Sequence, residues 1–308
     1  MSRRPDVTLT QLRYFVAAAG HGSMTQAAHE VRVAQSALSA AVAALERQLG
    51  TQLFIRQRAR GLVLTAAGEE FLSDARAVLA HVDEVLDTAR GRGDQVRGRI
   101  RMACFVTLAP FMLPELLADL AEHHPGLEVE VIETEAEALS TALRSGSAEI
   151  ALTYDLGLGP EIERQVVATV EPYVILPPEH RLAGRSRIHL EDLAHEPMVL
   201  LDLPHSRDYF QQMLASAGVT PSIRHRSASY ETVRGLVARG HGYSILNQRP
   251  VEDVTYGGAH LLPRPIADDL PPLSIVIARL STVRPTARAR AVATRARAVL
   301  QRESTDGA

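Results

Sequence analysis

The chain has 308 residues and a formal net charge of −3, and 46% of its residues are hydrophobic and 22% charged. This composition excludes a wholly disordered chain and can fill two or three domain cores without disulfides. The one cysteine, Cys104, has no partner for an internal disulfide, and no apolar run approaches the ~18 residues of a spanning helix. The first residues lack the apolar core of a signal peptide, so we expect a cytoplasmic protein that makes no membrane contact.

Arginine supplies all of the basic side-chain charge, because the sequence contains no lysine. That absence excludes Schiff-base chemistry, a phosphate-loop lysine and a Ser-Lys dyad. Residues 1–64 contain eight arginines and three acidic residues, a net charge of +5, so the remaining residues carry −8. A basic N-terminal module on an acidic body indicates that the N-terminal end meets phosphates.

Three N-terminal stretches place apolar residues at helical spacing and predict helices over about residues 9–19, 24–31 and 34–49. Two short apolar runs, 53–55 and 62–64, predict a hairpin around a loop with three arginines. Three helices followed by a basic hairpin predict a winged helix-turn-helix DNA-binding domain at residues 1–64, with the third helix in the major groove. A small helical subdomain with a solvated arginine surface is the alternative that the pattern leaves open.

A longer apolar stripe runs from Phe71 to Ala89, after Thr65 as a helix cap and before Gly91 and Gly93. It predicts a linker helix at residues 65–93 of about seven turns that has no core of its own. We therefore expect the stripe to pack on a second copy of the chain, which makes this helix a dimerisation element. The alternative is a helix that folds back on its own domain.

From Arg97 onward, expected strands and helices alternate, which predicts a mostly parallel sheet covered on both faces. About 210 residues of this pattern predict two similar subdomains. The expected strands are 98–104, 127–133, 149–154, 166–176, 198–201, 222–227, 242–246, 260–262 and 273–279, and the expected helices are 108–122, 136–145, 206–217, 230–239 and 286–301.

The N-terminal residues resemble the DNA-binding domain of LysR-type transcriptional regulators, without a gap from Leu12 to Gly68. The chain departs from the family at Ala34, where a serine usually begins the recognition helix, and at Ser36, where many relatives have proline. Alanine lacks the side-chain oxygen that caps the helix amides. The residues that carry the resemblance are Leu12, Phe15, Gly22, Ser23, Met24, Ala27, Ala28, Gln35, Ser36, Ala37, Leu38, Ser39, Leu45, Glu46, Leu49, Gly50, Leu53, Phe54, Arg56, Leu64, Thr65 and Gly68.

The resemblance implies an α/β chain with an N-terminal winged helix-turn-helix, a long linker helix and an effector-binding domain at residues 97–308. That domain is expected to be similar to the periplasmic-binding-protein fold, with subdomain I at about 97–170 and 266–308 and subdomain II at about 171–265. The implied partners are double-stranded promoter DNA, a small-molecule effector, further copies of the chain as a dimer or a dimer-of-dimers tetramer, and RNA polymerase.

Seven side chains are candidates for DNA contact by their positions in the matched motif. In the first turns of the third helix, we expect base and phosphate contacts from Gln35, Ser36 and Ser39. Before this helix and in the hairpin, we expect contacts with phosphates or the narrow groove from Arg32, Arg56, Arg58 and Arg60. These arginines supply affinity more than sequence discrimination.

Ligands of such α/β sheets bind beyond the carboxyl ends of the strands, here in the cleft between the subdomains. Thr107 follows the first expected strand and aligns with a ligand-binding hydroxyl of the family. The further candidates at strand ends are Phe105, Val106, Glu133, Glu135, Asp155, Asp202, Ser206 and Asn247. Because four of these are acids, one hypothesis is a ligand with an amine or a nitrogen-rich ring; the alternative is that the acids face solvent or pair within loops.

Together these features predict a sequence-specific transcriptional regulator whose promoter binding is modulated by a small molecule bound between two subdomains. Enzyme motifs are weak: the glycines at 157 and 159 do not form a dinucleotide loop, and Ser244 lacks the glycine of a nucleophile elbow. We expect no enzymatic activity, no cofactor and no metal site. Two alternatives remain open, a redox-responsive regulator that uses Cys104 and a constitutive DNA-binding protein without a ligand.

Overall fold

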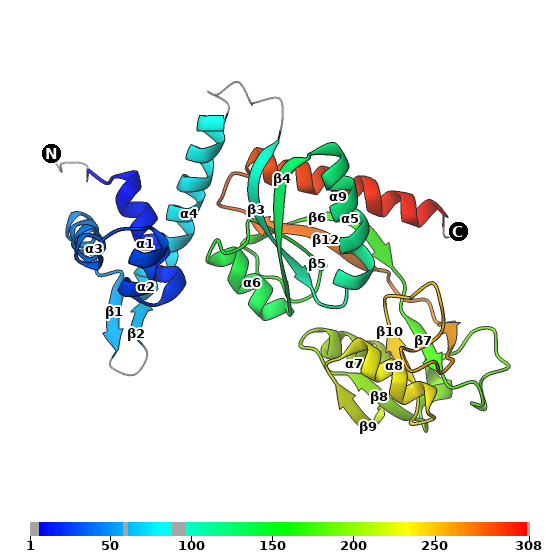
Figure 1. The fold of residues 1–308 in the computed structure, drawn as a ribbon. Coiled ribbons are helices and arrows are strands. Elements are labelled where there is room, and N and C mark those ends of the chain that lie inside the picture. The colour runs from blue at the N-terminus through cyan, green and yellow to red at the C-terminus, as the bar shows by residue number, and fades with distance from the viewer. Residues whose placement is uncertain (1–5, 58–60, 88–95, 307–308) are drawn as a thin grey trace.

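The computed structural model of the chain describes residues 6–57, 61–87 and 96–306. Figure 1 shows a helical N-terminal module, a helix α4 that runs beside it, and two α/β lobes of which the first lies next to α4. No helix within the described residues is both long and apolar enough to cross a membrane.

The N-terminal module contains three helices and a two-stranded antiparallel hairpin around one apolar core. Phe15 is fully buried at its centre, with its ring 5.2 Å from the rings of both Phe54 and Phe71. The first helix extends past its expected end because Gly20 remains helical, and the left-handed Gly22 ends it. The elements are α1 (Leu9–His21), α2 (Met24–Glu30), α3 (Gln35–Leu49), β1 (Phe54–Gln57) and β2 (Gly61–Leu64).

Helix α4 (Ala66–Asp87) begins after Thr65, whose Oγ1 accepts a hydrogen bond from the Gly68 amide at 2.9 Å. The expectation that its apolar stripe has no core of its own is wrong for the first half, because Leu72 and Ala75 are buried in the core of the N-terminal module. One face of the second half remains apolar and exposed in this chain, at Val78, Val85 and Leu86: the exposed fraction of Val85, for example, is 66%.

The first lobe contains a five-stranded sheet in the order β4-β3-β5-β12-β6. Its strands β4, β3 and β5 are parallel, but β12 runs antiparallel to both of its neighbours. Strand β6 therefore runs in the same direction as β4, β3 and β5, and the sheet is mostly parallel as predicted, with β12 as the exception because the chain returns from the second lobe and β12 enters between β5 and β6. The strands are β3 (Arg97–Phe105), β4 (Gly126–Thr134), β5 (Ile150–Tyr154), β6 (Ile162–Val170) and β12 (Leu273–Leu280), and the helices are α5 (Ala109–His123), α6 (Ala136–Arg144) and α9 (Ala287–Asp306).

The second lobe has its own apolar cluster and also mixes strand directions. Strand β8 is parallel to β9, whereas β7 is antiparallel to β10 and β11. The single strand expected at 166–176 is divided between the lobes, because Pro172 has no N–H with which to continue a ladder. The elements are β7 (Tyr173–Leu176), the 3-10 helix η2 (Leu190–Leu193), β8 (Pro197–Leu201), α7 (Ser206–Ser216), β9 (Ser222–Ser227), α8 (Tyr230–Ala238), β10 (Ser244–Leu246) and β11 (Leu262–Pro265).

Candidate functional site

The inner face of α3 anchors it in the module, and its first turn is open to solvent. Leu38 is fully buried in the core, whereas Gln35 and Ser36 are exposed and Ser39 is half-buried. The Gln35 amide Nε2 donates a hydrogen bond to Ser39 Oγ at 3.3 Å. Ala34 gives the helix no side-chain cap, so the amides of the first turn have no side-chain acceptor there. The helix therefore presents amide and hydroxyl groups suited to base edges and phosphates.

Arg32 lies between α2 and α3 with a φ of +56°, the left-handed region that β-carbon-bearing residues rarely adopt. Its amide donates to His29 O at 3.3 Å, and the Val33 amide donates to Ala28 O at 2.9 Å, which fixes the turn. The side chain is exposed. An arginine in a conformation that favours glycine or asparagine indicates that its charge serves something other than folding.

We expect Arg32→Asn to change the free energy of unfolding by less than about 0.5 kcal/mol, since asparagine tolerates the left-handed region. Without the guanidinium, affinity for promoter DNA should fall about tenfold. Fluorescence anisotropy and thermal unfolding measure the two effects, and Arg13→Gln on the exposed side of α1 is the control. Unchanged DNA affinity of the Arg32 variant would exclude a contact between this side chain and DNA.

The hairpin pairs Phe54 with Leu64 through to Gln57 with Gly61, and the backbone of Arg56 lies in β1 opposite Leu62. Arg58 and Arg60 lie outside the described residues. Glu46 at the end of α3 ties this hairpin to the helix, because its Oε1 accepts hydrogen bonds from the amides of Leu53 (2.8 Å) and Phe54 (3.1 Å). Glu46 belongs to the motif shared with the family, but its position in the sequence does not predict this bracing role.

Three of the expected effector residues line one small cavity between the lobes. Thr107 follows β3, Ser206 begins α7 and Asn247 follows β10, and the cavity that they share with Tyr154, Tyr230 and Gln248 has a volume of about 10 Å³. That volume is close to what a single water occupies. A metabolite therefore requires the lobes to separate before it can reach these side chains.

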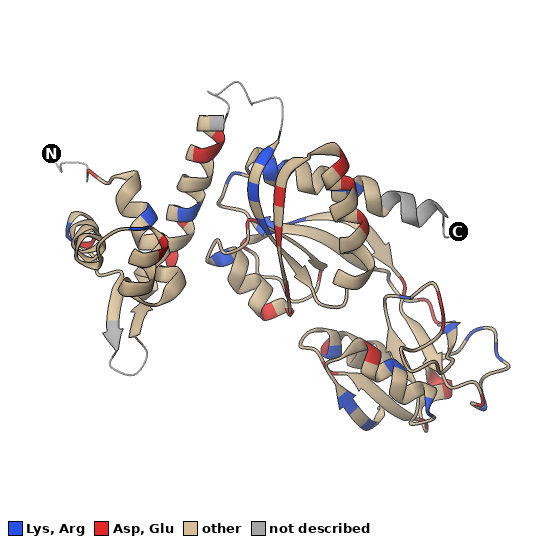
Figure 2. Cartoon of the chain, viewed as in Figure 1, with Lys and Arg blue, Asp and Glu red and all other residues tan. Residues whose placement is uncertain are grey.

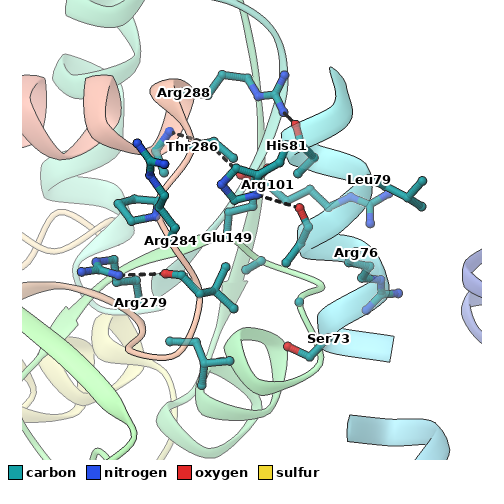
Figure 3. Close-up of a pocket in the computed structure, with 18 of the residues that line it drawn as sticks. Ser73, Arg76, Leu79, His81, Arg101, Glu149, Arg279, Arg284, Thr286 and Arg288 are labelled. Atoms are coloured by element: carbon teal, nitrogen blue, oxygen red, sulfur yellow. Dashed lines mark hydrogen bonds between the residues drawn. The ribbon is translucent and has the colours of Figure 1, made fainter. Parts of the chain in front are cut away.

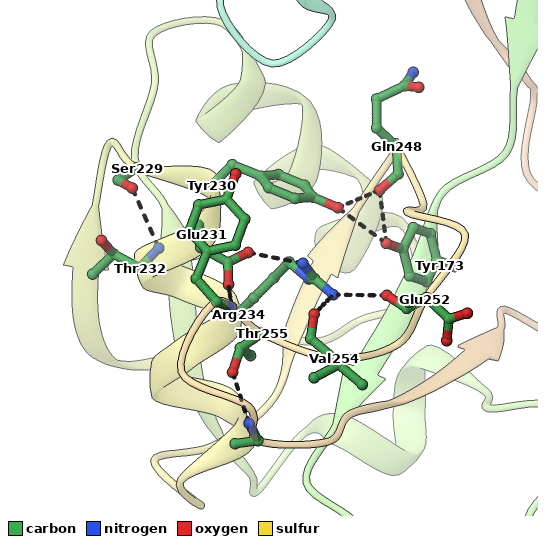
Figure 4. A network of polar contacts seen from close by, with 12 residues as sticks. Tyr173, Ser229, Tyr230, Glu231, Thr232, Arg234, Gln248, Glu252, Val254 and Thr255 are labelled. Carbon is green, nitrogen blue, oxygen red and sulfur yellow. Dashed lines mark hydrogen bonds and ion pairs between the residues drawn. The ribbon is translucent and has the colours of Figure 1, made fainter. Parts of the chain in front are cut away.

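A network of hydroxyl groups closes this cavity across the lobes. Gln248 Nε2 donates to Tyr154 Oη at 3.2 Å, and the hydroxyls of Tyr173 and Tyr230 donate to Gln248 O at 2.7 and 2.6 Å. Figure 4 shows Tyr173 and Tyr230 converging on Gln248 and, beside them, Arg234 held by Glu231. These residues are not among those predicted from the sequence, although Tyr154 ends a strand and Tyr230 begins a helix, which are signals of a site.

Burial keeps these phenols protonated. Burial raises the pKa of Tyr154 although hydrogen bonds from Gln248 and Thr107 oppose the rise, and it raises the pKa of Tyr173 to about 12. Burial and the neighbouring Tyr173 also raise the pKa of Tyr230. By contrast, Asn247 Oδ1 is a buried acceptor with no hydrogen-bond partner in the described part of the chain. The cavity therefore offers neutral hydroxyls and one unused carbonyl oxygen to a ligand.

A wider space of about 710 Å³ adjoins the lobes and is lined by Val106, Glu133 and Glu135, with Leu203 and Ala228 from the second lobe. Both glutamates are exposed, and no ion pair involving either is formed among the described residues. The negative charges of Glu133 and Glu135 in this space are therefore available to a ligand.

The other expected effector residues pack against or pair with neighbouring side chains of the protein. Phe105 is buried, with its ring 5.5 Å from that of Tyr154 in an edge-on arrangement. The guanidinium of Arg164 pairs with Asp155 at 2.8 Å. In the second lobe, Asp202 pairs with two arginines, Arg207 at 3.1 Å and Arg226 at 3.5 Å. The alternative that the acids pair within loops thus describes Asp155 and Asp202.

The loop after β5 contacts the start of α7 at Gly157 and His205. The ring of His205 lies so close to Gly157 that a β-carbon there would clash with it. His205 itself has a φ of +62°, another left-handed residue. The contact between the lobes at this point therefore depends on a glycine.

Cys104 is fully buried near the end of β3, and its Sγ donates to the Phe105 carbonyl at 3.7 Å. Burial, with a smaller contribution from the charge of Glu133, raises the pKa of this thiol to about 12. Because the thiolate is the reactive species, this environment suppresses nucleophilic and redox chemistry.

Comparison with known protein families gives two matches that together cover most of the chain. The family described as "Bacterial regulatory helix-turn-helix protein, lysR family" matches residues 9–69, and that described as "LysR substrate binding domain" matches residues 93–301.

Individual proteins are similar over most of their length. A "Probable hydrogen peroxide-inducible genes activator" of Mycobacterium avium is 36% identical over 249 residues, 79% of each chain. The crystal structure of HinK, a LysR family transcriptional regulator from Pseudomonas aeruginosa, is 35% identical with a TM-score of 0.65 and covers 96% of this chain and 99% of its own. A full-length OxyR variant from Pseudomonas aeruginosa is 26% identical with a TM-score of 0.79, covering 96% and 98%.

Proposed function

This chain belongs to the LysR family of transcriptional regulators, and we propose that a small molecule bound between its two lobes controls its binding to promoter DNA. The observation that carries the proposal is the convergence of Thr107, Ser206 and Asn247, from both lobes, on one polar cavity. In this account residues 1–64 bind DNA, residues 65–93 link and dimerise, and residues 97–308 bind the effector. Subdomain I is assigned to about 97–170 and 266–308, and subdomain II to about 171–265.

We propose that the first turn of α3 reads DNA through Gln35, Ser36 and Ser39, while Arg32 and the hairpin arginines hold the phosphates. The exposed positions of Gln35 and Ser36 and the left-handed Arg32 support this arrangement. Two such modules in a dimer read a two-fold-related site. We propose RNA polymerase as a further partner of the chain.

The closed cavity suggests how a ligand acts. At about 10 Å³ it holds no metabolite, so binding favours a conformation with the lobes further apart. The direct link from Gln248 to Tyr154 and the contact of His205 with Gly157 are the interactions that opening disrupts. A ligand shifts DNA binding only as far as it binds the two conformations unequally.

Thr107→Val removes the hydroxyl and preserves side-chain volume, so we expect it to leave basal DNA binding unchanged and to abolish the ligand response. The assay measures DNA affinity with and without a low-molecular-weight cell extract. Thr153→Val, at another buried threonine that does not line the cavity, is the matched control and should respond like the parent chain. A normal response of the Thr107 variant to the extract would contradict the assignment of the cleft as the effector site.

The names of the hydrogen peroxide-inducible relatives favour a second candidate function, a redox response through Cys104. The buried position and raised thiol pKa of Cys104 argue against it, and the chain has no second cysteine for an internal disulfide. We infer that any peroxide response of this chain does not start at Cys104.

At pH 8, a thiol with a pKa of about 12 is ionised in about one molecule in ten thousand. We therefore expect iodoacetamide to modify Cys104 in the folded chain very slowly, with a rate that still rises with pH above 10. The chain unfolded in denaturant is the control and should react with an ordinary thiol pKa. A rate plateau below pH 9 in the folded chain, or loss of a peroxide response in Cys104→Ala, would revive the redox function.

A further inference from the structure

A second pocket, open to solvent, lies between α4 and the first lobe, apart from the cleft between the lobes. Its volume is about 330 Å³, within the range of small-molecule sites. It is lined mainly by α4, β3, the segment between α6 and β5, and the segment that leads from β12 into α9, with Val16 of α1 at its edge. Figure 3 shows the labelled arginines placed around this space, and Figure 2 shows basic segments on both α4 and β3.

The lining is strongly cationic. Its acidic side chains are Asp83 and Glu149, whereas six arginines contribute to it: Arg76, Arg99, Arg101, Arg279, Arg284 and Arg288. Three of these arginines have carboxylate partners on neighbouring strands: Arg99 and Arg101 pair with Glu130, and Arg279 pairs with Glu163. No such ion pair is formed by Arg76, Arg284 or Arg288 within the described residues.

The two arginines that enclose the space from opposite sides each hold an unused donor. Arg76 on α4 donates from Nη1 to Ser145 O at 2.6 Å and to Ser147 Oγ at 2.9 Å, but its buried Nε has no partner in the described structure. Arg288 on α9 is 7% exposed and donates from Nη2 to Ala80 O at 3.3 Å, and its Nε is also buried without a partner there. The hydrogen-bond acceptors of both guanidinium groups are uncharged, so their positive charge is left to an oxyanion bound in the space.

The electrostatics indicate a shortage of negative charge in the same place. Burial, followed by repulsion from Arg101, lowers the pKa of Arg76 to about 10. Burial raises the pKa of the Glu149 carboxyl group, although Thr286 opposes the rise by donating to Oε2 at 3.0 Å.

We propose that this space binds a small multivalent oxyanion, a phosphate ester or a polycarboxylate, whose charge is balanced by Arg76, Arg284 and Arg288, the lining arginines that form no ion pair among the described residues. Arg76 lies on α4 and Arg288 on α9, so the bound anion joins the linker helix to the first lobe. Because α4 also contributes Leu72 and Ala75 to the core of the DNA-binding module, this bridge restrains the module relative to the lobe. The site is a second control point, separate from the pocket at Thr107.

Calorimetry on the full chain tests this site with pyrophosphate and citrate as separate probes at constant ionic strength. We expect one saturable site for each chain, and the probe that binds more tightly distinguishes the phosphate class from the carboxylate class. Arg76→Gln and Arg288→Gln should each weaken binding at least tenfold. Arg32→Asn, on the proposed DNA face, and Thr107→Val, in the cleft, should bind the probe like the parent chain.

Two further measurements test the oxyanion site if the Arg76 or Arg288 variant fails to fold. Arg284 is exposed, so Arg284→Gln should fold normally and reduce the affinity severalfold. In the parent chain, the bound probe should slow hydrogen exchange in α4 and at the start of α9. Absence of saturable binding by both probes, or exchange in these helices that is unchanged by saturating probe, would overturn the proposal and leave the function of the cleft untouched.

Discussion

Replacing Arg56, Arg58 and Arg60 together by glutamine is expected to lower the affinity for promoter DNA by about 10- to 100-fold and to flatten its salt dependence. Each phosphate contact by a cation contributes about 0.9 to the slope of log K against log salt, so three lost contacts remove about 2.7 for each module. This loss should be similar on specific and unrelated DNA, because phosphate contacts carry no sequence information.

Titrations at several salt concentrations with a promoter fragment and a shuffled fragment measure this effect. Replacement of Arg181, Arg185 and Arg249 by glutamine removes the same charge from the second lobe and is the matched control, expected to leave the slope unchanged. An unaltered slope in the hairpin variant would show that the hairpin does not contact phosphate, and the DNA-binding surface would then have to lie elsewhere.

The second large effect is expected at the exposed half of α4, where Val85→Asp should convert the dimer to monomers. Val78, Val85 and Leu86 have exposed fractions of 46%, 66% and 42%, and together with Val82 they line an apolar groove beside residues 282–284. A charge in such a patch cannot be buried against a second copy without a large desolvation penalty. Since a dimer engages two half-sites at once, the monomer should lose about 100- to 10,000-fold in DNA affinity.

Sedimentation analysis and DNA binding of the same preparations measure this outcome. Val251→Asp is the matched control, because that valine is 99% exposed but lies in the second lobe. A Val85 variant that remains dimeric would place the dimer interface elsewhere.

Much of the fold could be predicted because its signals are local. The helical spacing in the N-terminal module, the glycines at 22 and 50 and the strand–helix alternation after Arg97 predict elements close to those observed. The neighbours against which a helix or strand packs are not determined by its local sequence. The stripe of α4 is divided between the module core and an exposed groove, and the direction of β12 depends on where the chain returns from the second lobe.

The same distinction holds for the candidate site. Strand ends predict that Thr107, Ser206 and Asn247 converge, and they do line one cavity, but their role in binding a ligand remains a prediction. The partners of the acids could not be read from the sequence, because Asp202 pairs with Arg226, which is 24 positions away. The cross-lobe bond from Gln248 to Tyr154 joins residues 94 positions apart and has no sequence signature.

We propose that a ligand in the cleft controls sequence-specific DNA binding. The most direct test is sequencing of the genomic fragments retained by the purified chain and by Thr107→Val, each with and without a low-molecular-weight cell extract. We expect a few sites with a two-fold-related motif, and an extract that changes their occupancy for the parent chain alone. Uniform, salt-sensitive retention without a motif, or an equal effect of the extract on both proteins, would contradict this account.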